Sequence, residues 1–274
     1  MLYTTIFSDV DGTIGDKNHN ISKENIAAAH RGVNYGLDII LCSGRDPMSL
    51  INISKKMGIT SNYVIAFNGG TIWESNTKKI LLNTVMDKSI ALEILNDIQH
   101  FQVCIGVYIN DNTIIAKNPT EAMLLMVDHN ITVADSDFIT KINEDIIKIM
   151  VIANKGILDI IYNKIYDKIK NRFIMVFTNT HILEFMPISV NKGEGIKWLS
   201  NYLNLPLHKA VAFGDNFNDI EMLKLAGMGI AIKNAVMPLK EIADYITKND
   251  NNTSGFAEVI DYVININEAN KKKG

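Results

Sequence analysis

The sequence predicts an α/β protein in two parts: a doubly wound core built on a parallel sheet, and an α+β insert that interrupts it. Three features predict this fold class. Short apolar runs alternate with amphipathic runs over roughly the first 80 residues, the pattern changes from about Val85, and the alternation returns beyond Pro187. Crossover helices cover both faces of a parallel sheet, so its strands are apolar runs between helices. We therefore assign residues 1–84 and 187–274 to the core and residues 85–186 to the insert.

The first core segment carries start and stop signals for its helices. Ser22 is a favourable N-cap residue, and Gly36 suits the left-handed conformation that follows a helix. Pro47 suits the first turn of a second helix, which Gly58 ends. The predicted elements, in order, are a strand at Tyr3–Ser8, a helix from Ser22 to about Tyr35, a strand at Leu37–Cys42, a helix from Pro47 to Gly58, a strand at Asn62–Phe67 and a hairpin that begins at Asn68 and runs through Asn76 and Thr77.

The rest of the chain is divided by the same periodicity rules. The insert is predicted to contain a helix at Lys88–Gln99, strands within Val103–Lys117, a Met-rich helix at Thr120–Asp128, a strand at Ile146–Ala153, a helix at Ile157–Lys170 and strands at Phe173–Phe177 and Ile182–Phe185. The second core segment is predicted to contain a helix at Lys192–Leu203, a strand at Ala210–Phe213, a helix at Asn218–Leu225, a strand at Met228–Ile232, a short helix, a short strand and a final helix from Ser254 to about Ile264.

The composition is that of a folded, soluble protein. Of 274 residues, 47% are hydrophobic and 21% are charged, as in ordinary globular domains. The net charge of −3 gives no cationic field for a nucleic-acid backbone, so we expect no nucleic-acid partner. No run approaches ~18 apolar residues and Asp9 interrupts the first one, so we expect neither membrane contact nor secretion. Cys42 and Cys104 lack CxxC spacing, which argues against a disulfide framework or a zinc site and favours a cytoplasmic location. We also expect a monomer or small homo-oligomer.

Two carboxylates follow the first predicted strand. Asp9 and Asp11 are two residues apart, so in extended chain their side chains point the same way, and Gly12 lets the chain turn at once. One carboxylate can then attack while the other transfers protons. A calcium loop or a plain Asp-Gly turn is the alternative. A calcium loop would place an acid at Thr13 and a Glu at Asn20, which this sequence does not.

A second acidic segment, Gly214–Asp219, follows the strand predicted at Ala210–Phe213. Asp215 and Asp219 can reach a hard cation from one side. Asn218 can donate a hydrogen bond to an anion at the N-terminus of the next helix, where the backbone amides also favour negative charge. An ordinary helix N-cap with an acid in its first turn explains this segment equally well.

Weaker candidates lie at the other strand ends. Ser43 and Gly44 follow the second strand and suit a phosphate oxygen, and Lys192 begins a helix just beyond the last strand of the insert. Asn68 either contacts the substrate or only begins a hairpin. Each signal is weak alone, but all these segments come at or just beyond the carboxyl ends of strands, where open α/β sheets bind their ligands.

These motifs resemble the haloacid dehalogenase superfamily of phosphatases, and specifically its Cof-like branch. The family motif DxDGT corresponds to Asp9–Thr13, and the Ser or Thr followed by Gly-Arg corresponds to Ser43-Gly44-Arg45. The motif lysine corresponds to Lys192, and GDxxND corresponds to Gly214–Asp219. The resemblance covers both core segments and, by position and length, the insert.

The resemblance implies a site and a mechanism. Asp9 would be the nucleophile that forms an aspartyl-phosphate, and Asp11 the general acid and base. Mg²⁺ would be held by Asp9, the Asp11 main-chain carbonyl and Asp215, with Asp219 ligating the ion or steadying its shell. The phosphoryl oxygens would be held by the groups at five positions: the Val10 amide, Ser43, Gly44, Lys192 and Asn218. The insert would be a mobile cap that selects the substrate.

The expected function is therefore Mg²⁺-dependent hydrolysis of a small phosphorylated metabolite, such as a sugar phosphate or a cofactor phosphate. Four site carboxylates balance Mg²⁺ and Lys192 only if Asp11 is protonated, so we expect activity to require the metal. A phosphomutase of the same fold is one alternative, and it would need cations in the cap such as Lys141, Lys148 or Arg172. A sensor that binds a phosphorylated ligand without turnover is the other.

Overall fold

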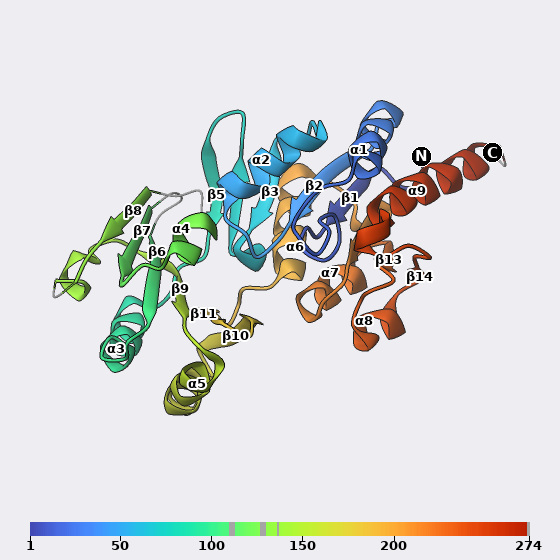
Figure 1. Cartoon of the computed structure of the whole chain (residues 1–274). Coiled ribbons are helices and arrows are strands. Elements are labelled where there is room, and N and C mark those ends of the chain that lie inside the picture. The colour runs from blue at the N-terminus through green and yellow to red at the C-terminus, as the bar shows by residue number, and fades with distance from the viewer. Residues whose placement is uncertain (110–112, 127–129, 136, 273–274) are drawn as a thin grey trace. The chain divides into compact units, whose positions relative to one another are not determined.

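The computed structural model describes residues 1–109, 113–126, 130–135 and 137–272 (Figure 1). The chain divides into two compact units. Unit 1 comprises Met1–Leu82 with Asn191–Gly274, and unit 2 comprises Asn83–Val190. No helix among the described residues is long and apolar enough to cross a membrane.

Unit 1 is built on an eight-stranded sheet in the order β14-β13-β12-β1-β2-β3-β4-β5. The six strands from β14 to β3 are parallel, and β4 pairs antiparallel with β3. The strand bounds, in sheet order, are Tyr245–Ile246, Met228–Ala231, Ala210–Gly214, Thr5–Ser8, Asp38–Cys42, Tyr63–Ala66, Thr71–Glu74 and Lys79–Asn83. The parallel strands other than the edge strand β14 are almost entirely buried, as expected for a sheet with helices on both faces.

The first two helices of unit 1 begin and end where their capping residues predict. Ser22 caps α1 by accepting a hydrogen bond from the Asn25 amide, and Gly36 ends it in the left-handed conformation. The helices of this unit are α1 (Lys23–Tyr35), α2 (Pro47–Met57), α6 (Lys192–Leu203), α7 (Ile220–Leu225), α8 (Met237–Ile242) and α9 (Gly255–Lys271). The strand-helix order confirms the predicted doubly wound α/β fold.

Unit 2 is an α+β unit with a six-stranded sheet in the order β10-β11-β9-β6-β7-β8. All its neighbours pair antiparallel except β7 and β8. Its elements are α3 (Lys88–Ile98), β6 (Cys104–Ile109), β7 (Thr113–Lys117), α4 (Glu121–Met126), β8 (Asn130–Val133), β9 (Ile146–Ile152), α5 (Lys155–Ile169), β10 (Phe173–Asn179) and β11 (Ile182–Pro187).

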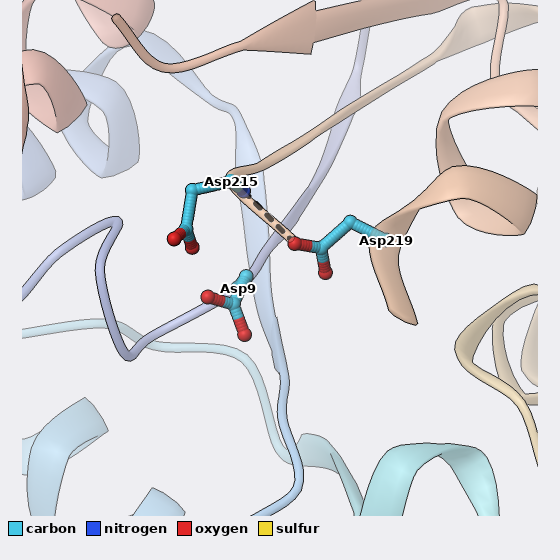
Figure 2. Close-up of side chains that lie close together, drawn as sticks. All are labelled: Asp9, Asp215 and Asp219. Carbon is cyan, nitrogen blue, oxygen red and sulfur yellow. Dashed lines mark hydrogen bonds between the residues drawn. The ribbon is translucent and has the colours of Figure 1, made fainter. Parts of the chain in front are cut away.

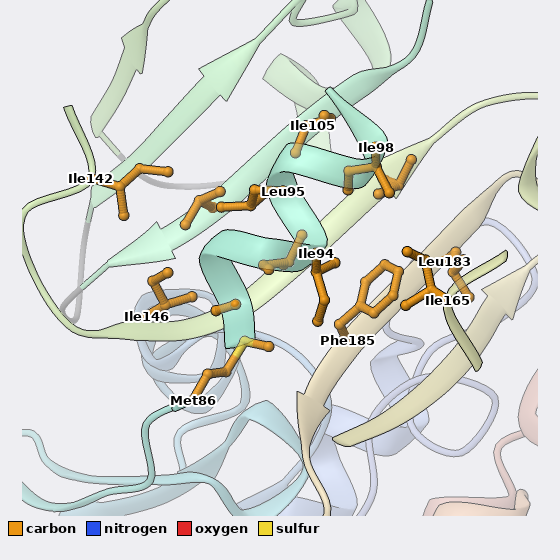
Figure 3. Packing of buried hydrophobic residues seen from close by; sticks show 14 of the residues in the cluster. Met86, Ile94, Leu95, Ile98, Ile105, Ile142, Ile146, Ile165, Leu183 and Phe185 are labelled. Carbon is orange, nitrogen blue, oxygen red and sulfur yellow. The ribbon is translucent and has the colours of Figure 1, made fainter. Parts of the chain in front are cut away.

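One face of the unit 2 sheet packs against α3 and α5 to form an apolar core (Figure 3). Ile94 and Leu95 of α3, Ile165 of α5 and Phe185 of β11 are all buried there. Ile, Leu and Val dominate the cluster, and α3 places its apolar residues with helical spacing. This core gives unit 2 its own source of stability.

The differences from the predicted elements lie mainly at element ends and edges. The helix predicted at Asn218–Leu225 is a 3-10 turn, Phe217–Asp219, followed by α7, because Asn216 and Asp219 form a capping box at that turn. The final helix runs to Lys271, well beyond Ile264. Strand β8 was not predicted, since it is a mostly exposed edge strand without an apolar run. The helix predicted at Thr120–Asp128 is described over Glu121–Met126, and residues 127–129 lie outside the described residues.

Candidate active site

The parallel register of three central strands brings the predicted segments together. Strand β1 lies between β12 and β2, with Ser8 opposite Phe213 on one side and opposite Leu41 on the other. Asp9, Ser43 and Asp215 are the residues that directly follow β1, β2 and β12. All three therefore lie at the carboxyl edge of the sheet, where α/β proteins place their sites.

Three carboxylates converge at this edge. Asp9, Asp215 and Asp219 each offer an oxygen, and these oxygens all lie within 4.8 Å of one another (Figure 2). Opposite ligands of an octahedral Mg²⁺ are about 4 Å apart, because each metal–oxygen bond is about 2.1 Å. The spacing and the all-oxygen donor set therefore fit a hard divalent cation.

The three acids are held differently. Asp219 is fully buried, and its Oδ2 accepts hydrogen bonds from the Asp215 and Asn216 amides, both at 2.9 Å. Asp215 Oδ1 accepts a hydrogen bond from the Thr13 hydroxyl at 3.0 Å. Asp219 therefore orients the Asp215 backbone, while Asp9 and Asp215 keep oxygens for a cation. This arrangement suits Asp219 to steadying the shell more than to direct ligation.

Lys192 supplies the positive charge of the cluster. It is fully buried at the first position of α6, where Asn191 caps the helix. Its Nζ donates to Asp9 Oδ1 at 2.5 Å and to Asp219 Oδ1 at 2.6 Å.

Gly69 has a φ of +96°, and a Cβ at that position would overlap the Asn191 carbonyl. A glycine is therefore required where the loop after β3 packs against the start of α6.

The cluster carries more negative charge than Lys192 can balance. Burial raises the pKa of Asp9 well above its usual value, and the neighbouring acids raise it further, against the lowering effect of Lys192. Burial and the charge of Asp219 raise the pKa of Asp215 to about 6. A divalent cation bound here would supply the missing positive charge.

The Asp11 side chain lies apart from the three-acid cluster and pairs with a residue that was not assigned a role. Arg45 donates to Asp11 Oδ2 through Nε at 2.8 Å and to Oδ1 through Nη2 at 2.5 Å. His19 Nδ1 lies 3.1 Å from Asp11 Oδ1. Burial would raise the pKa of Asp11, but Arg45 and, to a smaller extent, His19 lower it below its usual value. The expected charge balance left out Arg45, whose positive charge faces Asp11 in this arrangement.

The predicted phosphate-binding groups lie on adjoining loops. Ser43 is buried, and its carbonyl accepts a hydrogen bond from the Asn68 amide at 2.9 Å. The Asn218 side-chain amide donates to Asn68 Oδ1 at 2.9 Å, and a Cβ on Gly44 would press on the Asn68 side chain. Val10 is buried between Asp9 and Asp11, and its carbonyl accepts bonds from the three amides that close the following turn, those of Thr13, Ile14 and Gly15.

Sequence reasoning missed the positioning residues rather than the acids. Arg45 stood within the quoted Ser-Gly-Arg motif, so its signal was present but unused. Thr13 likewise belongs to the DxDGT motif. Asn68 was left between a substrate contact and a hairpin start, and the structure places it between Ser43 and Asn218. His19 carried no signal, because its contact with Asp11 depends on the fold of the loop between them.

Comparison with known proteins gives the class to which this site belongs. A model of the haloacid dehalogenase-like hydrolase family matches residues 6–260. A Streptococcus pyogenes serotype M6 protein named "Putative phosphatase" is 30% identical over 260 residues, covering 92% of this chain and 95% of that protein. A Bacillus subtilis protein named 5-amino-6-(5-phospho-D-ribitylamino)uracil phosphatase is 26% identical over 283 residues, covering 93% and 96%.

The fold comparison agrees. The crystal structure of a haloacid dehalogenase-like hydrolase from Bacteroides thetaiotaomicron matches with a TM-score of 0.85 at 24% identity, covering 95% of this chain and 99% of that one. The chain belongs to the haloacid dehalogenase-like hydrolase family. Family membership confirms the predicted class of enzyme, a haloacid dehalogenase-type hydrolase related to phosphatases, with a Rossmann-like core and an inserted cap domain.

Proposed function

We propose that this protein is a Mg²⁺-dependent phosphatase that hydrolyses a small phosphomonoester through an aspartyl-phosphate on Asp9. One observation carries the proposal: a buried carboxylate at a strand end has one oxygen fixed by Lys192 at 2.5 Å and lies among two further acids. Fixing one oxygen leaves the other for attack on phosphorus. An isolated structural ion pair would not need two buried acids and a half-buried one around one lysine.

The chain's own groups can perform both half-reactions. In the first, an Asp9 oxygen bonds to phosphorus as the bond to the leaving oxygen breaks, and Asp11 gives that oxygen a proton. Because Arg45 favours the ionised form of Asp11 in the free site, Asp11 has to bind this proton before the step. In the second, Asp11 takes a proton from water as the water oxygen bonds to phosphorus and the Asp9–phosphorus bond breaks. Lys192, Ser43, Gly44, Asn218 and the Val10 amide are the groups proposed to hold the phosphoryl oxygens.

Mg²⁺ would be held by Asp9, the Asp11 carbonyl and Asp215, with Asp219 orienting Asp215. When bound, it would neutralise negative charge on the transferring phosphoryl group. The raised pKa values of Asp9 and Asp215 support this assignment, because they indicate a cluster that lacks a cation.

The proposed substrate is a small phosphorylated metabolite, selected by the inserted unit. The Bacillus subtilis relative named for a phosphorylated ribityl compound supports a sugar-like or cofactor-like leaving group. We propose that neither nucleic acid nor membrane is a partner, and that the protein acts as a monomer or small homo-oligomer. Cys42 and Cys104 are free, buried and in different units, which supports the reducing conditions of the cytoplasm.

A phosphomutase would need free cations in the insert for the second phosphate of a bisphosphate. The three candidates are each paired with a carboxylate inside unit 2: Lys141 with Asp137, Lys148 with Glu184, and Arg172 with Asp87. This pairing favours the phosphatase. Product analysis separates the two, because a mutase yields an isomeric sugar phosphate in place of free phosphate.

The test is phosphate release from a panel of sugar phosphates, nucleotides, cofactor phosphates and p-nitrophenyl phosphate. We expect release with Mg²⁺, none in excess chelator, and a loss of at least about 1,000-fold in Asp9→Asn, because the amide cannot form the acyl phosphate. Turnover in chelator would contradict the metal requirement. Unchanged turnover in Asp9→Asn would exclude Asp9 as the nucleophile, and ligand binding without turnover in the wild type would favour the sensor.

A further inference from the structure

The Asp11 side chain is partly exposed, so ion pairs and hydrogen bonds, rather than close packing, have to fix the orientation of its carboxyl group. Its side chain is 42% exposed, whereas that of Asp9 is 6% exposed. Both of its oxygens are engaged by Arg45 in a bidentate pair. A guanidinium fork fixes the plane of a carboxylate as well as its position, which a single ammonium group does not.

Arg45 is itself held in a rigid turn between β2 and α2. Its amide donates to the Ser43 hydroxyl at 3.3 Å, and its carbonyl accepts from the Phe67 amide at 2.9 Å. The next residue, Asp46, caps α2 by accepting from the Ser49 amide. The guanidinium therefore extends from a backbone that is fixed on both sides.

His19 makes the weaker contact with Asp11. It reaches only Oδ1, its side chain is 69% exposed, and it lies on a loop at a φ of +61°. Asp11 and Arg45 also line a cavity of about 170 Å³ in unit 1, together with Asn52, Ile53 and Lys56 of α2. The Asp11 carboxyl group is thus presented at the wall of a space that a small group can enter.

We propose that Arg45 is a positioning residue for the proton transfers of Asp11. The inference rests on the proposed function, and it assigns Arg45 a role separate from binding the phosphoryl group. Without Arg45, Asp11 keeps one contact to one oxygen and its carboxyl plane is free to rotate. Proton transfer to the leaving oxygen then fails more often, while attack by Asp9 is unaffected.

This role predicts a dependence on the leaving group. An alkoxide leaves only with a proton, so an alkyl phosphate such as a sugar phosphate needs Asp11 in the first half-reaction. Nitrophenolate is a stable anion and leaves without one. Since kcat/KM reports the steps up to the first irreversible one, Arg45→Ala should lower it selectively for the alkyl substrate. Water activation by Asp11 serves both substrates, so kcat should fall for both.

The experiment compares wild type, Arg45→Ala and Arg45→Lys on glucose 6-phosphate, or the best alkyl substrate of the panel, and on p-nitrophenyl phosphate. We expect Arg45→Ala to lose about 10- to 100-fold in kcat/KM on the alkyl phosphate, within the range of general acid catalysis, and less than about threefold on the aryl phosphate. The variant should also show a burst of nitrophenol before a slower steady state. Arg45→Lys should recover only part of the loss.

Arg31→Ala is the matched control. Arg31 makes a bidentate pair with Asp261 on the surface of the same unit, with Nη2 2.8 Å from Oδ2. The side chains of this pair are each 48% exposed, and Arg45 and Asp11 are 32% and 42% exposed, so each pair should contribute no more than about a twofold to fivefold change in the unfolding equilibrium. Arg31→Ala should leave both substrates unaffected.

The outcomes separate the two claims. Equal losses on both substrates in kcat/KM, or no loss on either, reject the positioning role while the phosphatase assignment stands. Full activity of Arg45→Lys on the alkyl phosphate also rejects it, since the fork would then be unnecessary. A wild-type protein that releases phosphate from no compound overturns the proposed function and this role with it.

Discussion

Lys192 is the position where a single substitution should most clearly affect both the stability of the fold and its chemistry. Lys192→Met keeps nearly the same length and volume but removes the charge and the donors to Asp9 and Asp219. Two buried carboxylates and the half-buried Asp215 then face one another without a cation. The variant should fold less stably and lose turnover.

The size of the effect follows from the burial. Lys192 and Asp219 are fully buried, and Asp9 is nearly so. Removing one partner of a buried ion pair costs about 3–5 kcal/mol, which is a large share of the roughly 5–15 kcal/mol that stabilises a typical domain. At ~2–4 °C per kcal/mol for a unit of this size, Tm should fall by roughly 6–20 °C.

Tryptophan fluorescence provides the assay, because Trp73 and Trp198, the two tryptophans of the chain, both belong to unit 1. Urea unfolding without Mg²⁺ gives the free energy of unfolding of each variant. Lys197→Met is the control, since this lysine on the same helix is 52% exposed and should change stability by under about 0.5 kcal/mol.

Adding Asp219→Asn to Lys192→Met should restore part of the stability, because the substitution removes one of the uncompensated charges. Mg²⁺ should stabilise Lys192→Met more than the wild type. If Lys192→Met unfolds within about 1 kcal/mol of Lys197→Met, the reasoning that a buried cation holds this cluster together is refuted.

Two further predictions concern the acidic cluster. The pKa of Asp215 is raised to about 6, so the charged form of this side chain is disfavoured in the folded protein, and stability without metal should fall as pH rises through about 6. Mg²⁺ binds the charged form. The increase in the protein's Tm on adding Mg²⁺, measured by scanning calorimetry, should therefore be larger at pH 7.5 than at pH 5. Equal increases at both pH values would show that the site does not titrate there. Gly12→Ala places a Cβ against Asp215 at a φ of +76° and should weaken Mg²⁺ binding at least about tenfold by calorimetric titration. Gly36→Ala should not, because its Cβ, at a φ of +96°, meets only the Met1 side chain at an ordinary 3.6 Å. Mg²⁺ binding by Gly12→Ala at wild-type affinity would contradict this reading of the turn.

The sequence predicted best those parts of the fold that local chemistry determines. Helix α1 begins after Ser22 and ends before Gly36 because a hydroxyl cap and a left-handed glycine are local devices. Helix α6 has the predicted bounds, Lys192–Leu203, for the same kind of reason. Strand β8 escaped prediction because its pairing with β7, rather than an apolar run, makes it a strand.

The same contrast between local signals and contacts made by distant segments applies to the site. Asp9, Asp215 and Lys192 were predictable because each follows a buried strand or begins a helix at one sheet edge. The pairing of Arg45 with Asp11 was not, because it depends on how two loops 34 residues apart approach one another. Residue type and motif spacing indicate which acids gather at the sheet edge. They do not indicate which cation each acid faces.

The pairing of β1 with β12 also has a consequence for the order in which the chain folds during synthesis. Thr5 of β1 lies opposite Ala210 of β12, so the centre of the unit 1 sheet joins a strand made before unit 2 to a strand made after it. Unit 2 is one continuous segment, Asn83–Val190, and can bury its own apolar core as it leaves the ribosome. Throughout that time β1 lacks one neighbour, and Asp9 lacks both Lys192 and Asp215. A nascent chain therefore carries a completed inserted domain before it carries any active site, and the catalytic centre is among the last parts to assemble.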